Sequence, residues 1–239
     1  MARTWVERTT WQGQPAWRKT YEEGGHRRRI AALRWLARRL GANALLAPVP
    51  LTAERACRTE QSMINRLAAL GARVPPLLQV GERELVLGDL GPTLAMACRA
   101  ERDPAGRQAL VLRGLQAIGD VHALGGYLSQ AFARNLTVQA GAIGFIDLEE
   151  DPATTMSLAA AQARDLLFYA HSTARFLADQ PGAHAALLRT HLQSVSAVVR
   201  EEVARTAHAL RWLVPLARPF GERARDVAEA LGSLAAACR

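Results

Sequence analysis

The pattern of apolar and polar positions divides the chain into a first part with strand signals and a second part that is mostly helical. Two segments rich in Trp, Thr, Val and Tyr, residues 3–11 and 16–21, flank a Gln-Gly-Gln-Pro break at 12–15. Such a pattern is typical of a β-hairpin. Two shorter strand candidates follow at 77–80 and 84–90. The first part is therefore expected to contain a small sheet.

Two helices are expected between these strands. Residues 26–40 place apolar side chains on one stripe and arginines around the rest, which indicates an amphipathic helix. A second helix is expected over 54–70. There Thr52 can cap the first turn and Gly71 can end the last one.

From residue 93 onward the apolar positions follow a helical period. The expected helices cover residues 105–124, 157–180, 183–211 and 219–237. One interruption, residues 135–150, holds two short apolar strands around Gln139-Ala140-Gly141 and predicts a hairpin among the helices. The fold class expected is α+β. A small β-rich lobe covers residues 1–90, with the basic helix inserted, and a helical lobe covers 91–239.

Composition narrows the class of protein. The chain has 239 residues, of which 49% are hydrophobic and 22% charged, which excludes a disordered chain, a collagen-like repeat and a disulfide mini-scaffold. Three cysteines without a C-x-x-C spacing indicate neither a disulfide framework nor a zinc site. No apolar stretch approaches the length of a membrane span, and the first residues lack the apolar core of a signal peptide. A cytoplasmic protein is expected.

The net charge of +8 favours anionic partners, whether phosphorylated small molecules, an acidic membrane surface or nucleic acid. Nucleic acid is the weakest of these, because no recognition motif accompanies the charge and few aromatic residues interleave with it. Helix 26–40 would suit peripheral contact with an anionic membrane, at the inner membrane of a bacterial cell. An arginine-coated surface helix packed on the small lobe explains the same pattern.

Lys19 is the only lysine among 30 basic residues, and it lies in the middle of the strand AWRKTY. Glu60, in the helix expected over 54–70, is placed to supply an acidic partner for it. The alternatives are an exposed lysine on an edge strand and a solvated helix carboxylate.

Asn135 and Asp147 lie a dozen residues apart on the two arms of the expected hairpin. An amide oxygen and a carboxylate in that arrangement can converge on Mg²⁺, which prefers oxygen ligands. Asp147 also follows the apolar run Gly-Phe-Ile, where a carboxylate is costly to bury without a partner. The alternative is a carboxylate that caps the following segment.

The stretch from His122 to Asn135, followed by Ile143-Gly-Phe-Ile-Asp147, resembles the catalytic and metal-binding loops of aminoglycoside phosphotransferases and lipopolysaccharide-core (Kdo) kinases. Those loops have approximately the pattern H-A-x-G-x-x-H-G-D-x-x-x-x-N, followed by I-D. The resemblance implies a two-lobed protein-kinase-like fold. It also implies transfer of the γ-phosphoryl group of ATP to a hydroxyl of a saccharide or lipid-linked acceptor. Lys19 would hold the phosphates, Glu60 would orient Lys19, and Asn135 and Asp147 would bind Mg²⁺.

Three further segments carry the resemblance, which covers residues 16–180. Residues 60–75 resemble the helix that precedes the fourth strand of these kinases, together with the residues that lead from the helix to that strand. Residues 84–91 resemble the hinge that hydrogen-bonds adenine, which makes Gly88 and Asp89 candidate cofactor-binding residues. Asp165 resembles the helix residue that orients the catalytic-loop backbone.

Two departures weaken the match. Gln130 stands where the catalytic aspartate belongs, and an amide cannot accept the acceptor's proton, a loss of about 10²–10⁴-fold in rate. Glu149 or Glu150 could supply another base. Only 18 residues precede Lys19, and they contain no glycine-rich turn over the phosphates.

Two main functions therefore remain open. One is a divergent phosphotransferase, since phosphoryl transfer depends mostly on positioning and charge stabilisation. The other is a pseudokinase, a binding module that senses a nucleotide or another ligand without catalysis. A membrane-surface structural protein that uses helix 26–40 is a weaker third.

Overall fold

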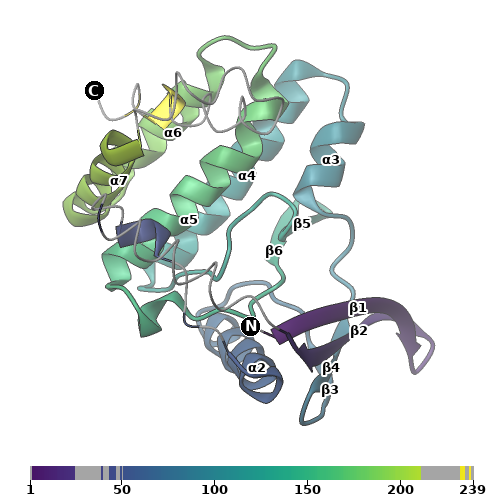
Figure 1. Cartoon of the computed structure of the whole chain (residues 1–239). Helices are drawn as coiled ribbons and strands as arrows, with labels where there is room; N and C mark the ends of the chain where they lie inside the picture. Colours follow the sequence, from purple (N-terminus) through teal and green to yellow (C-terminus); the bar gives the residue numbers. More distant parts are fainter. Residues whose placement is uncertain are drawn as a thin grey trace.

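The computed structural model describes residues 2–24, 39, 43–46, 49, 51–210, 232–234 and 237. Within them the chain has a small antiparallel sheet toward the N-terminus and a helical region after it, so the α+β class is confirmed (Figure 1). The helices expected over 26–40 and 219–237 lie almost entirely outside the described residues.

The sheet has four strands in the order β1-β2-β4-β3, each pair antiparallel. Its strands are β1 (Ala2–Trp11), β2 (Gln14–Glu23), β3 (Leu77–Val80) and β4 (Glu84–Gly88). Gln12 and Gly13 form the turn between β1 and β2, both with positive φ (49° and 80°). Two such residues in succession match the right-handed twist of the flanking strands. The expected hairpin is therefore confirmed, with a two-residue turn in place of the four-residue break.

Helix α2 (Ala53–Ala69) packs on β2 and closes the core of this part. Thr52 accepts a hydrogen bond from the amide of Arg55, and Gly71 has a φ of 77° after the last turn. Both ends therefore lie where the capping residues predicted them. The buried face of α2 includes Cys57, Met63, Ile64 and Leu67.

The helical region consists of α3 (Leu94–Ala100), α4 (Pro104–Ala123), α5 (Leu158–Thr173), α6 (Ala183–Ser194) and α7 (Ala197–Leu210), with three short 3-10 turns, η1 (Asn43–Leu45), η2 (Pro152–Thr154) and η3 (Ala174–Leu177). The single helix expected over 183–211 is wrong. Val195 has an extended backbone, and the Ser196 hydroxyl accepts a hydrogen bond from the amide of Val199 at the start of α7. A side-chain cap in mid-stripe thus divides the helix although the apolar period continues. No described helix is long and apolar enough to span a membrane.

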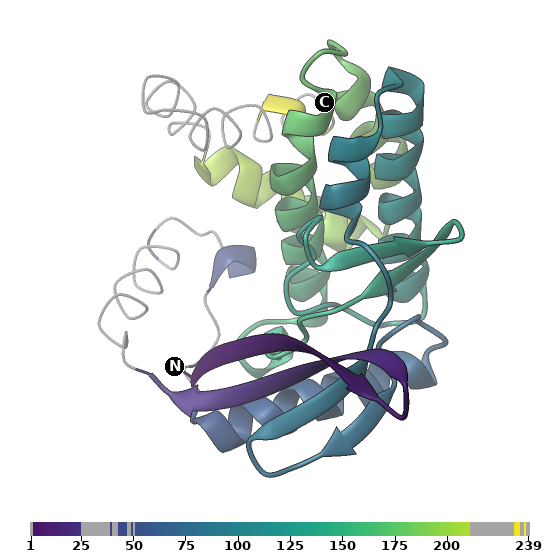
Figure 2. The ribbon, with the colours of Figure 1, turned by 90° about the vertical axis from the view of Figure 1, so that its right-hand side faces the viewer.

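The expected hairpin among the helices is present as β5 (Leu136–Gln139) and β6 (Ala142–Phe145). It lies on the side of the helical region that faces the sheet (Figure 2). The segment 88–93 carries the chain from β4 into α3. Gly88 begins that segment, and a Cβ there would lie 2.5 Å from Pro76 Cγ, so only glycine fits without a shift. The sheet and the hairpin face one another across this connecting segment.

We expect the free energy of unfolding to fall between pH 7 and pH 5 because of His184. Burial lowers the pKa of His184 from 6.5 to about 4. Its Nε2 lies 3.0 Å from the Thr173 hydroxyl, which itself donates to Tyr169 O, so Nδ1 is left without a partner to stabilise a second proton. Below about pH 6.5 His184 binds a proton in the unfolded chain, whereas in the folded chain it binds that proton only near pH 4 and below. The loss for this one residue is about 2 kcal/mol at pH 5.

Urea unfolding at the two pH values measures this effect. His184→Gln should lose about that much of the pH dependence, whereas His208→Gln, at an exposed position of α7, should keep it. An unchanged pH dependence in His184→Gln would contradict the assignment.

Candidate functional site

Lys19 lies in a cluster of carboxylates that comes from three distant parts of the chain. Its Nζ is 2.6 Å from Glu60 Oε2, 2.8 Å from Asp147 Oδ1 and 3.6 Å from Glu149 Oε2. The lysine side chain is only 5% exposed. Burial alone lowers its pKa, but the three carboxylates outweigh that effect and raise the pKa above its usual value. Lys19 therefore stays protonated at any physiological pH.

Glu60 joins the sheet to the segment that follows β6. Its side chain is 1% exposed, and Oε2 accepts hydrogen bonds from both Lys19 and the Tyr21 hydroxyl. Its other oxygen, Oε1, accepts a hydrogen bond of 3.2 Å from the amide of Leu148. Both oxygens are thus satisfied, as a buried carboxylate requires. The helix α2 thereby fixes the positions of Lys19 and of the residue next to Asp147.

Asp147 has a left-handed backbone, with a φ of 62°. A non-glycine residue in this region costs about 1–3 kcal/mol and persists only where its neighbours hold it. The amide of Ile146 donates to Asn135 O at 2.9 Å on one side, and that of Leu148 donates to Glu60 on the other. The bend leaves the Asp147 carboxylate on Lys19, with its side chain 36% exposed.

Asn135 is buried, and its amide nitrogen donates to Gln130 O at 3.0 Å. Its Oδ1 accepts no hydrogen bond from the described residues. Both Asn135 and Asp147 line the same cleft. A carboxylate and a free amide oxygen are hard ligands that suit Mg²⁺, which takes one or two protein ligands beside phosphate oxygens and water. No group of three or more His, Cys, Asp or Glu residues that could hold a metal occurs in the described part of the chain.

Gln130 does not line that cleft. Its side chain hydrogen-bonds Glu150, whose Oε2 is also 2.8 Å from Arg164 Nη2. The Ser129 hydroxyl donates to Glu150 O. Glu150 is therefore occupied by an amide and a guanidinium. Gln130 belongs to a polar network beneath the loop.

Asp165 anchors the same loop from α5. Its carboxylate is fully buried, and Oδ2 accepts the amide of Leu128 at 2.8 Å and lies 3.0 Å from His122 Nε2. The loop that carries Gln130 and Asn135 is thus held at its first residue by a side chain of α5.

A cleft of about 850 Å³ separates the sheet from the helical region. Lys19, Glu60, Gly88, Asp89, Asn135 and Asp147, six of the seven predicted site residues, are among those that line it. Further lining residues, which the sequence argument did not single out, include Val6, Arg8, Trp17, Leu90, Met96 and Arg134. A cleft of this size matches the volume of a small-molecule site.

Leu90 lies in the connecting segment and lines the cleft. The amide of Gly88 donates to Pro76 O at 3.0 Å, and that of Asp89 donates to Pro15 O at 3.4 Å. The N–H and C=O of Leu90 make no hydrogen bond within the described residues, although Leu90 is only 8% exposed. A buried peptide group without partners is costly, and a ligand with a donor and an acceptor on one edge would satisfy it.

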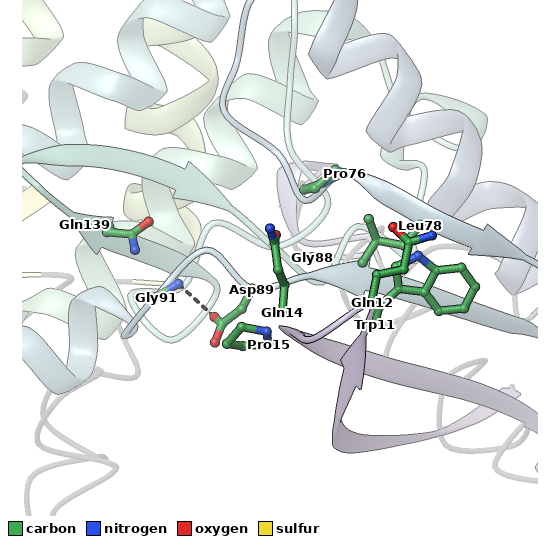
Figure 3. A pocket seen from close by; sticks show the side chains of 10 residues that line it. All are labelled: Trp11, Gln12, Gln14, Pro15, Pro76, Leu78, Gly88, Asp89, Gly91 and Gln139. Atoms are coloured by element: carbon green, nitrogen blue, oxygen red, sulfur yellow. Dashed lines mark hydrogen bonds between the residues drawn. The ribbon is translucent and has the colours of Figure 1, made fainter.

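The Asp89 side chain holds the connecting segment itself. Its Oδ1 accepts a hydrogen bond of 2.8 Å from the amide of Gly91, shown by the dashed line in Figure 3. A second pocket of about 400 Å³ lies at this place, lined by the β1–β2 turn, the connecting segment and Gln139. Asp89 is therefore a positioning residue for the segment rather than a partner of Lys19.

No protein-family model matches the chain, and no curated protein matches it. Any function proposed for the chain therefore rests on the geometry of the cleft.

Replacing Glu60 by Gln should lower the free energy of unfolding by about 2 kcal/mol, because it removes the shortest ion pair of the buried Lys19, which Asp147 and Glu149 then compensate only in part. Urea unfolding measures the change. Glu54→Gln on the same helix is the matched control. Glu54 pairs with the exposed Arg58, so its loss should cost less than about 1 kcal/mol. Equal costs for the two variants would contradict the role given to Glu60.

Proposed function

We propose that the chain is a divergent ATP-dependent phosphotransferase of protein-kinase-like fold, which moves the γ-phosphoryl group of ATP to a hydroxyl. The observation that carries the proposal is the buried Lys19–Glu60 pair, which lines one wall of a cleft that Asn135 and Asp147 also line. This arrangement gives a fixed positive charge and two oxygen ligands in one enclosed site. Those are the parts that phosphoryl transfer needs.

Lys19 is suited to hold the α- and β-phosphates. Glu60 and Asp147 fix its ammonium group from two directions, so little side-chain freedom is left to lose on binding. The pKa of Lys19 is raised, so the positive charge is present throughout the physiological range. Arg8 and Arg134 also line the cleft and add positive charge for an anionic ligand.

Leu90 is suited to bind the edge of the nucleobase. Its free N–H and C=O provide one donor and one acceptor from the same residue, which matches the paired acceptor and donor of adenine. Apolar side chains at Val6, Trp17 and Leu87 line the same cleft and offer surface for a planar ring. Leu90 thus takes the adenine-binding role that the resemblance gave to the neighbouring Gly88 and Asp89.

Asn135 and Asp147 would hold Mg²⁺, which neutralises phosphate charge as the phosphoryl group is transferred. The free Oδ1 of Asn135 and the partly exposed carboxylate of Asp147 are the donor atoms. Asn135 is held ready by its hydrogen bond to the backbone of Gln130.

The acceptor hydroxyl in this proposal belongs to a saccharide or lipid-linked saccharide. The support for it is the resemblance to the lipopolysaccharide-core and aminoglycoside kinases, together with Arg8 and Arg134, which suit an acidic acceptor. Peripheral contact with an anionic membrane rests on the arginines of residues 26–40, of which all but Arg39 lie outside the described residues.

A second candidate function is a pseudokinase that binds a nucleotide without turnover. One observation favours it. Gln130 is engaged with Glu150, which in turn pairs with Arg164, so the place of the usual base serves the structure of the loop.

Calorimetric titration of ATP with and without Mg²⁺ tests the site. We expect binding that needs Mg²⁺ in the unaltered chain. It should weaken at least about tenfold in Lys19→Ala and Asp147→Ala, each of which removes a charge-assisted contact. Asp120→Ala, an exposed carboxylate on α4 away from the cleft, is the control and should bind normally. Unchanged binding in Asp147→Ala would overturn the proposal.

Gln130→Asp separates the two candidate functions. A phosphotransferase that already uses another base should gain less than about tenfold in ADP production, because the new carboxylate only replaces a structural amide. Gln130→Asn is the matched control for loss of the contact with Glu150. A gain of about 10²-fold or more would indicate that a catalytic base has been lost at position 130, and would favour the pseudokinase.

A further inference from the structure

A second sizeable pocket lies within the helical region, and we call it the α4–α6 pocket. It has a volume of about 490 Å³ and opens where α4 packs against α5 and α6. Val195 and Ser196, at the break between α6 and α7, form one of its walls. It shares no described lining residue with the cleft that contains Lys19. Its size is that of a small-molecule site.

Two buried imidazole nitrogens in this pocket lack a hydrogen-bond partner. They are Nδ1 of His122 and Nε2 of His191, which make no hydrogen bond with the described residues. The His122 side chain is 5% exposed, and its Nε2 lies 3.0 Å from Asp165 Oδ2. Because the carboxylate accepts the proton on Nε2, Nδ1 of the neutral ring is an acceptor. A buried acceptor without a partner is costly, and a ligand that donates a hydrogen would satisfy it.

The ring of His191 lies against the backbone of α4. A Cβ at Gly119 would be 2.8 Å from His191 Cε1, so the glycine makes room for the ring. Burial lowers the pKa of His191 to about 4, although the carboxylate of Asp120 opposes the shift. The ring is therefore neutral at physiological pH and adds no positive charge to the pocket.

Two other polar side chains of the pocket also offer acceptors. Gln162 Nε2 donates to His122 O at 3.1 Å and to Gly126 O at 2.9 Å, which uses both of its hydrogens and leaves Oε1 for a ligand. The hydroxyl of Ser194 donates to His191 O at 2.7 Å, so only its lone pairs remain. The pocket is thus richer in acceptors than in donors.

The charge of the pocket is opposite to that of the chain. The protein carries a net charge of +8, with 30 basic residues. None of the described residues that line the α4–α6 pocket is Lys or Arg, whereas Asp120 supplies a carboxylate. A metal ion is not indicated, because the described part of the chain contains no suitable group of three His, Cys, Asp or Glu residues. A negative pocket of acceptors suits an organic cation.

We propose that the α4–α6 pocket binds a small organic cation with a primary ammonium group. An ammonium group has three N–H donors and no acceptor, which complements the groups that the pocket offers. One ammonium would donate to His122 Nδ1 and Gln162 Oε1. Asp120, which is exposed, would attract the positive charge at the mouth of the pocket, so a short diamine suits the site. This inference does not depend on the proposed phosphotransferase function.

Calorimetric titration of the full chain with 1,4-diaminobutane at neutral pH tests the inference. We expect saturable binding of one molecule per chain, and 1,4-butanediol, of the same length but uncharged, should bind at least about tenfold more weakly. Asp120→Asn removes the charge at an exposed position and should weaken diamine binding about tenfold. Glu201→Gln, an exposed carboxylate on α7 that does not line the pocket, is the matched control and should bind normally.

His122→Gln tests the buried acceptor. Glutamine keeps a nitrogen that can donate to Asp165 but removes the acceptor at Nδ1, so diamine binding should weaken about tenfold. Thermal unfolding confirms that this variant is folded, and Asp120→Asn decides the question if it is not. Absence of saturable diamine binding overturns the inference, as does equal affinity for 1,4-butanediol. Binding that is unchanged in Asp120→Asn also overturns it, because the cation would then bind elsewhere.

Discussion

A buried ion pair between Lys19 and Glu60 is the interaction on which the rest of the site depends. Removing two charges from water costs several kcal/mol for each ion, and apolar residues of the same size would serve stability as well. The cost is offset because Asp147 and Glu149 also face the lysine. In addition, the Tyr21 hydroxyl and the amide of Leu148 donate hydrogen bonds to the Glu60 carboxylate. The sheet, α2 and the end of β6 must therefore be assembled together. A pair that is this expensive and this well satisfied is best explained by the charge it holds at the cleft.

The loop from Leu128 to Asn135 is ordered without the carboxylate that the resemblance leads one to expect. Asp165 holds its first amide, and the Gln130 side chain reaches Glu150. Glutamine at position 130 thus contributes to the framework of the loop. Glu150 pairs with Arg164, whereas the neighbouring Glu149 faces Lys19 and accepts a hydrogen bond from Thr4. The two glutamates are adjacent in sequence, yet their side chains contact different parts of the molecule.

The sequence by itself determined the local elements. Turn residues at Gln12-Gly13, the cap at Thr52 and the stop at Gly71 act through neighbours a few positions away, so their effects can be read directly from the chain. The lone lysine and the spacing from Asn135 to Asp147 also allowed the principal candidate site residues to be predicted from the sequence. The helix expected over 183–211 failed because a serine cap at its middle competes with an apolar period that continues unbroken.

Only the tertiary structure decided which groups meet. Thr4 and Glu149 are 145 residues apart, and no local pattern marks either of them as the partner of the other. The amides of Gly88 and Asp89 donate to Pro76 and Pro15, whereas the N–H and C=O of Leu90 make no hydrogen bond among the described residues. Gln130 points to Glu150 rather than to the cleft for the same kind of reason. Periodicity and capping depend on a few adjacent residues, whereas these contacts depend on how the sheet, α2 and the hairpin pack against one another.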